Sequence, residues 1–180
     1  SRLTVSGKGF AYRFDNGTLA SMRAGGRELL HGGPVLDVYR PPTSNETYDW
    51  GTDDRRIWHN LGLDDLTTTV TGVTSRREAD AVIVRTTSTV AGKGVSFAQT
   101  MTYRIDSRGT VTLGHEVDPD ARAAVLPYLP RVGVSLRLPE TLKTFSWYGR
   151  GPHENYNDRQ SGAPMGVYRS TVADEYVRYS

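Results

Sequence analysis

The 180-residue chain contains no cysteine, which excludes disulfides, thiol catalysis and thiolate zinc sites. It also has no apolar run of the roughly 20 residues that a membrane span needs, and no basic-then-apolar signal peptide at its start. The 22 basic and 20 acidic residues leave a net charge of +2, with no basic block long enough to follow a phosphate backbone. We therefore expect neither nucleic acid nor a membrane as partner, and a cytoplasmic location.

Short β-like segments separated by turns dominate what is present. Large and small side chains alternate over residues 10–14, and Asp15-Asn16-Gly17 follows as a hairpin turn, because Asn and Gly tolerate positive φ. We expect further strands over residues 18–22, 27–30, 81–90, 95–105, 110–117 and 142–148. Prolines make residues 125–138 a bulged or edge strand.

Residues 53–61 differ from the rest because they have the pattern of a short helix. Asp53 is a suitable N-cap, apolar residues follow at helical spacing, and Gly62 is a stop signal. Many short strands with one helix favour a β-sandwich, and no linker or repeat divides residues 1–180, so we predict one domain. Residues 172–180 end without a closing turn or charged tail, and we expect a truncated domain.

Acidic and histidine side chains do not form a convincing reaction centre. The acidic pairs lie in turn-like or capping contexts that explain them structurally; they are Asp53/Asp54, Asp64/Asp65, Asp118/Asp120 and Asp174/Glu175. The four histidines lack metal-ligand spacing and a companion acid at such spacing. His115 and Glu116 are neighbours on an expected strand and should face opposite sides. We therefore predict no catalytic residue and no metal site.

Two segments are richer in recognition chemistry. Residues 40–51, called the rim loop below, combine prolines, hydrogen-bonding groups and aromatic rings, and loops on rigid scaffolds often carry binding. Residues 147–159, called the signature below, are dense in aromatic, acidic and Arg side chains. Such groups suit sugars, whose C–H faces are apolar and whose hydroxyls are polar. The same composition also builds a buried ion-paired corner, and the residues alone leave both interpretations open.

Both segments carry a family resemblance. The signature, W-Y-G-R-G-P-H-E-N-Y-N-D-R, resembles the W/Y-x-G-x-G-P-x-E-x-Y-x-D-R motif of the C-terminal small-chain domain of bacterial β-galactosidases, in glycoside hydrolase family 2. Residues 40–46, R-P-P-T-S-N-E, are similar to that domain's R-A-P-T-D-N-D loop, from which Pro41 and Ser44 depart, while Glu46 replaces Asp. Shorter similarities follow in order over residues 58–66, 101–106 and 129–133.

The resemblance implies an all-β, antiparallel supersandwich of the galactose mutarotase type, of which this chain would be the N-terminal part. It places the family's catalytic glutamates and magnesium ligands in a (β/α)₈ barrel outside this segment, so we expect no cofactor here. The rim loop would lie beside the active-site mouth, with Arg40, Thr43, Asn45, Tyr48, Trp50 and Gly51 as substrate-rim residues. The structural signature residues would be Trp147, Gly149, Gly151, Pro152, Glu154, Tyr156, Asp158 and Arg159. We interpret the last four of them as an ion-paired corner.

The expected function is that of a non-catalytic β-galactosidase domain that helps to hydrolyse terminal β-D-galactosides. It would complete the active-site rim and contribute assembly contacts, with the galactoside, the other enzyme domains and further copies in a homo-oligomer as partners. One alternative is a stand-alone carbohydrate-binding module, which must bind sugar by itself. A less favoured alternative is a mutarotase-like aldose epimerase, because that chemistry needs an acid and a base facing one sugar.

Overall fold

The computed structural model describes residues 1–47, 53–153, 155 and 160–176. The chain divides into two compact units, Ser1–Arg137 and Leu138–Ser180. Within the described part of the chain, none of the helices is long and apolar enough to cross a bilayer.

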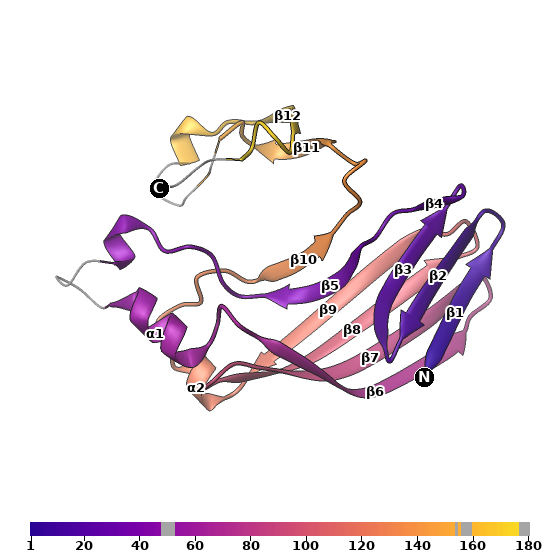
Figure 1. Cartoon of the computed structure of the whole chain (residues 1–180), viewed down its shortest axis with the longest axis horizontal. Helices are drawn as coiled ribbons and strands as arrows, with labels where there is room; N and C mark the ends of the chain where they lie inside the picture. The colour runs from indigo at the N-terminus through magenta and orange to yellow at the C-terminus, as the bar shows by residue number, and fades with distance from the viewer. Residues whose placement is uncertain (48–52, 154, 156–159, 177–180) are drawn as a thin grey trace. The chain divides into compact units, whose positions relative to one another are not determined.

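The first unit begins with a four-stranded antiparallel meander (Figure 1). Its strands are β1 (Arg2–Gly7), β2 (Phe10–Asp15), β3 (Thr18–Ala24) and β4 (Arg27–Glu28). The turn between β2 and β3 has positive φ at Asn16 (48°) and Gly17 (83°), as the Asn-Gly pair predicts. The hairpin expected over residues 10–22 is therefore confirmed, and β1 is an addition to the expected set.

A second four-stranded antiparallel sheet is built from longer strands in sequence order. Its strands are β6 (Thr67–Arg77), β7 (Ala81–Ala91), β8 (Ser96–Asp106) and β9 (Val111–Pro119). Burial alternates residue by residue along β8, because successive side chains point to opposite faces. The strands expected over residues 81–90, 95–105 and 110–117 are confirmed, whereas β6, a mostly polar and exposed run, was not expected.

The two sheets pack face to face through a core that includes Phe14, Leu19, Val84, Tyr103 and Ile105. The Phe14 and Tyr103 rings meet edge to face with centroids 5.0 Å apart, a favoured aromatic geometry. Burial raises the pKa of Tyr103 to about 12. This face-to-face packing of antiparallel sheets is the sandwich that the strand pattern predicts.

A second core cluster supports the rim loop. It surrounds Trp58, which is 2% exposed, and includes Val38, Leu63 and Phe97. Trp58 lies on α1 (Asp54–Leu61), where Asp53 accepts from the Arg56 N–H and Gly62 ends the helix with a φ of 73°. The helix predicted over residues 53–61 is confirmed with both of its caps. A four-residue helix, α2 (Ala121–Ala124), adds to it and is capped by Asp120.

The first unit is completed by a two-stranded antiparallel ribbon of β5 (Gly32–Asp37) and β10 (Gly133–Arg137). The edge strand expected over residues 125–138 thus forms only at its C-terminal end. The second unit pairs β11 (Thr144–Arg150) with β12 (Met165–Thr171) and contains the 3₁₀ turn η2 (Gln160–Gly162). The strand expected over residues 142–148 corresponds to β11, and β12 lies beyond the last strand that the sequence pattern predicted.

Candidate functional site

The described part of the rim loop, residues 40–47, closes on itself through one buried carboxylate. It contains the 3₁₀ turn η1 (Ser44–Glu46), and Glu46 is only 8% exposed. The Arg40 guanidinium donates from Nη1 and Nη2 to the two Glu46 oxygens at 2.8 and 2.7 Å. The Thr43 N–H and hydroxyl also donate to Glu46, at 2.6 and 2.9 Å. A bidentate pair reinforced by a backbone donor fixes the loop conformation.

These donors also determine the protonation state of Glu46. The hydrogen bond from Arg40 lowers the pKa of Glu46 to about 2, against the opposing effect of burial, and the Thr43 donors lower it further. The carboxylate is therefore ionised throughout the physiological pH range.

Contacts made by Arg40 and Glu46 fasten this self-paired loop to the rest of the first unit. Arg40 Nε donates to the Pro130 carbonyl at 3.0 Å, and the guanidinium lies over the Trp58 ring, 5.7 Å from its centroid. The Tyr128 hydroxyl lies 2.7 Å from Asp54 Oδ2, on the first turn of α1, and 3.3 Å from Glu46 Oε1. Burial, and then the bond to Asp54, raise the pKa of the Tyr128 phenol.

The expected rim residues therefore fall into three groups. Thr43 and the two Nη atoms of Arg40 donate within the loop itself, to Glu46. Asn45 is exposed on η1 and is the rim residue available for contact with another molecule. Tyr48, Trp50 and Gly51 lie outside the described residues.

A surface depression of about 490 Å³ lies beside the loop. Its lining is polar except for one aromatic ring: Tyr39, Thr47, Asp53, Arg55, Arg56, His59 and Asp64. Arg56 pairs with Asp53 through Nε and Oδ2 at 2.9 Å, and His59 Nδ1 lies 2.9 Å from Asp64 Oδ2. The hydrogen bond from His59 lowers the pKa of Asp64. Such a set of donors, acceptors and one ring can bind a polyhydroxylated ligand.

The His59–Asp64 pair corrects the expectation that the histidines lack a companion acid. The left-handed turn at Gly62 folds the chain back after α1 and brings Asp64 to His59. Spacing rules for helices and strands do not cover such a turn. The capping role expected for Asp53 and Asp120 is confirmed, since both are N-caps, whereas Asp118 lies within β9 rather than in a turn. His115 is partly buried against Gln99 at 3.1 Å, whereas Glu116 is exposed.

In the second unit the described signature residues form an aromatic stack. The Trp147 ring lies between Phe145 and Tyr168, with centroid distances of 5.5 and 5.4 Å, and its Nε1 donates to the Arg150 carbonyl at 3.0 Å. Gly151 is buried beside this stack, where a Cβ would come within 2.8 Å of the Tyr168 ring. This close approach explains the glycine of the motif.

The remaining signature positions have these placements. Gly149 lies on β11 opposite Gly166, and Pro152 follows a cis Gly151–Pro152 bond. Glu154, Tyr156, Asp158 and Arg159 lie outside the described residues. Arg150, which the sequence reasoning did not single out, donates to the carbonyls of Gln160 and Ala163 at 3.0 and 3.1 Å.

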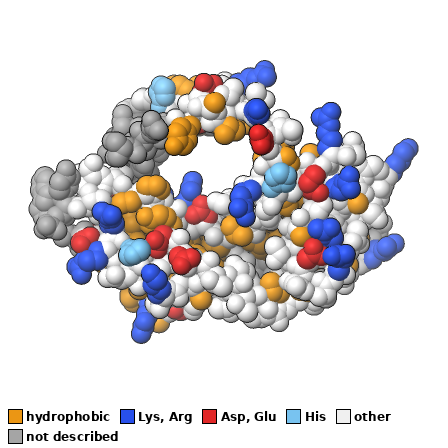
Figure 2. Space-filling view, in the orientation of Figure 1, with side chains coloured by type: hydrophobic (Ala, Val, Ile, Leu, Met, Phe, Trp, Pro, Cys, Tyr) orange, Lys and Arg blue, Asp and Glu red, His pale blue; other side chains and the backbone are white. Residues whose placement is uncertain are grey.

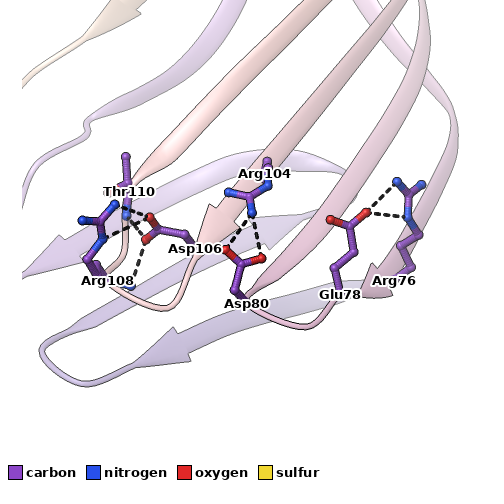
Figure 3. A network of polar contacts seen from close by, with 7 residues as sticks. All are labelled: Arg76, Glu78, Asp80, Arg104, Asp106, Arg108 and Thr110. Carbon is purple, nitrogen blue, oxygen red and sulfur yellow. Dashed lines mark hydrogen bonds and ion pairs between the residues drawn. The ribbon is translucent and has the colours of Figure 1, made fainter.

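A second group of charged residues lies at the β6–β7 and β8–β9 turns (Figure 3). Its three pairs are Arg76–Glu78, Arg104–Asp80 and Arg108–Asp106. Asp106 also accepts the backbone N–H of Thr110 at 2.9 Å, so it shapes the turn. Exposed pairs such as Arg76–Glu78 and Arg104–Asp80 contribute little stability. Figure 2 likewise shows side chains of both signs interspersed over the face in view.

The described residues do not fit a magnesium site. Across residues 1–47, 53–153, 155 and 160–176, no three His, Cys, Asp or Glu side chains come together in a group that could hold a metal ion.

The first unit is thus an antiparallel β-sandwich that carries a self-paired polar loop. Residues 6–180 match the family described as β-galactosidase small chain. The chain is 33% identical to the β-galactosidase of Lactobacillus delbrueckii subsp. bulgaricus, over 98% of this chain and 17% of that protein. It is 27% identical to the β-galactosidase of Priestia megaterium, over 98% of this chain and 16% of that protein. It is 31% identical to β-galactosidase 2 of Enterobacter cloacae, over 98% of this chain and 18% of that protein.

The chain therefore belongs to the β-galactosidase small chain family. It spans about one sixth of the length of these curated relatives.

Proposed function

We propose that this chain is an accessory domain of a β-galactosidase and assists the hydrolysis of terminal β-D-galactosides from the rim of an active site that other domains provide. The observation that carries the proposal is the rim loop, in which an internal Arg40–Glu46 pair leaves Asn45 exposed on a fixed turn. A fixed polar side chain can contact a bound sugar without a large ordering cost. The relatives named above support the reaction class.

The role of each loop residue follows from its contacts. Glu46 and Arg40 hold the loop, Thr43 completes their hydrogen bonding, and Asn45 supplies an amide that can both donate and accept. Bond cleavage needs a pair of acids flanking the glycosidic oxygen, and we place that pair in the rest of the enzyme. The same surface would contact neighbouring domains or subunits of the assembled enzyme.

Kinetics of a whole galactosidase containing this chain test the proposal. Asn45→Ala should lower kcat and kcat/KM together by about fivefold to thirtyfold, the rate equivalent of about 1–2 kcal/mol, with little change in Tm. Asn60→Ala is the matched control, because Asn60 is also exposed but lies on α1 and does not line the depression. Unchanged kinetics for Asn45→Ala in a folded enzyme would refute the proposal.

The depression beside the loop favours a second candidate, a carbohydrate-binding module. Tyr39 offers a ring, while Arg55, Arg56, His59 and Asp64 offer donors and acceptors. A module must bind without other domains, so titration of the isolated chain with galactose and lactose separates the two functions. Saturable binding that is lost in Tyr39→Ala would favour the module.

A further inference from the structure

Tyr128 occupies a distinctive position in the first unit, because its hydroxyl lies between two carboxylates from different elements. It is 2.7 Å from Asp54 Oδ2 and 3.3 Å from Glu46 Oε1. A phenol has a single proton to donate, and the Tyr128 hydroxyl shares it between Asp54, at the shorter distance, and Glu46. The hydroxyl therefore links the first turn of α1 to the rim loop through hydrogen bonds on both sides.

The orientation of the phenol is fixed by its ring rather than by its hydroxyl. The Tyr128 and Trp58 rings meet edge to face, with centroids 5.8 Å apart and planes at 82°. Trp58 is in turn covered on its face by the Arg40 guanidinium. Removal of the hydroxyl alone should therefore leave the ring in place, so its contribution can be tested separately from packing.

The position of the rim loop depends on the contacts that leave it. The Arg40–Glu46 and Thr43–Glu46 bonds are internal to the loop. The described hydrogen bonds that leave it include Arg40 Nε to the Pro130 carbonyl and Tyr128 to Glu46. Pro130 and Tyr128 belong to the same segment. Tyr128 connects this segment to Asp54 on α1, and Arg40 also contacts α1 through the Trp58 ring.

We infer that Tyr128 is a positioning residue that holds the rim loop against the first turn of α1, so that Asn45 is presented in a productive place. The inference rests on the proposed function, since it concerns the orientation of a substrate-rim contact. Loss of the hydroxyl should loosen the whole self-paired loop as one body, because the Arg40–Glu46 pair within it remains intact.

The test is a double-mutant cycle in the whole galactosidase. Tyr128→Phe should lower kcat by about fivefold at unchanged KM. Asn45→Ala is likewise expected to lower kcat without a change in KM. Because Tyr128 acts through the loop, the double variant should be no slower than Asn45→Ala alone. Active-site titration and circular dichroism of Tyr128→Phe should show the same fraction of folded enzyme as the wild type. If Tyr128 were needed only for folding, this fraction would fall.

Tyr12→Phe is the matched control. The Tyr12 hydroxyl donates to the Gly109 carbonyl at 2.6 Å within the first unit's main core, away from the loop. This variant loses the same atom and should lose some stability while kcat per active site stays unchanged.

The possible results separate the two claims. If Asn45→Ala is slow and Tyr128→Phe is as fast as wild type, the positioning role is refuted and the rim function stands. Independent, multiplying effects in the double variant would also refute it. If Asn45→Ala has wild-type kinetics, the rim function fails, and the positioning role fails with it.

Discussion

Glu46 is the residue on which the described part of the rim loop depends. It is almost fully buried, it carries a full negative charge, and Arg40 and Thr43 supply its partners. Burial of an unpaired charge is costly, so the pair is stable only while both members are present and ionised. The lowered pKa of Glu46 reflects the stabilisation of its charge by these partners. A pKa that is lower in the folded than in the unfolded state adds to the free energy of unfolding when the group is ionised.

This shift predicts a pH-dependent contribution to the free energy of unfolding. The pKa of Glu46 falls from 4.5 in a model compound to about 2 in the fold. The contribution is therefore complete above pH 4.5 and disappears as the pH falls to about 2. Glu46→Gln should lower the free energy of unfolding by about 2–3 kcal/mol at pH 7, and this difference should shrink between pH 4.5 and 2. Urea denaturation across that range measures it.

Glu116→Gln is the matched control for this experiment. Glu116 is exposed on β9, and its side chain makes no hydrogen bond to any residue that the structure describes. Its substitution should change the free energy of unfolding by less than about 0.5 kcal/mol. A Glu46→Gln difference that stays constant from pH 7 to pH 2 would contradict the ionic role of the carboxylate.

At the scale of elements, the crossing of β5 over β3 depends on one glycine. A Cβ on Gly33 would meet the Leu19 carbonyl oxygen and lie 3.2 Å from the Thr18 methyl group. The backbone of Leu19 is fixed in the β3 ladder and cannot move freely. Gly33→Ala should therefore lower the free energy of unfolding by about 1–3 kcal/mol, measured by denaturant titration.

Gly133→Ala tests whether this effect is specific. Gly133 lies on β10, the strand paired with β5, and a Cβ there would have no neighbour within 4 Å. The substitution should change stability by no more than about 0.5 kcal/mol. Equal losses in both variants would show that the ribbon needs flexible backbone rather than a close approach.

Local signals predicted the elements that local chemistry determines. The Asn16-Gly17 turn and the capped helix α1 follow from residues next to one another in the sequence. Strand β6 has no clear alternation of apolar and polar residues, because most of its side chains are exposed. Its position in the sheet is set by pairing with β7. Strand β12 similarly depends on its partner β11.

The candidate site was predictable in composition but not in orientation. The sequence singled out Arg40, Thr43 and Asn45, yet only the fold reveals that Arg40 turns inward to Glu46. Tyr128 was not predicted, because it meets Glu46 and Asp54 from 82 and 74 residues away. No local spacing rule contains a contact of that range.

At the scale of the whole molecule, the chemistry of the described residues predicts a chain without hydrolytic activity of its own. Its acidic groups serve as caps, turn acceptors and ion-pair partners, as Asp53, Asp120, Asp106 and Glu46 illustrate. The isolated 180-residue chain should not release product from a chromogenic β-galactoside, whereas a whole galactosidase should. Activity that survives repurification and is lost on substitution of an acid in this chain would contradict the prediction.

The exposed apolar face of the second unit predicts that the isolated chain associates with itself in solution. On its ribbon Tyr148 lies directly opposite Val167, and Met165 is two residues away on the same face. These side chains are 76%, 79% and 55% exposed, and an exposed apolar face on a two-stranded ribbon favours association. Sedimentation velocity should therefore show a mass that rises with protein concentration.

One added charge on that face should oppose the association. Val167→Lys should shift the chain toward the monomer, because self-contact would then bury an ammonium group without a partner. Thr89→Lys is the matched control, since it adds the same charge to an exposed position on β7 of the first unit. It should leave the association unchanged. A wild-type chain that stays monomeric at every concentration would show that the ribbon face does not self-associate.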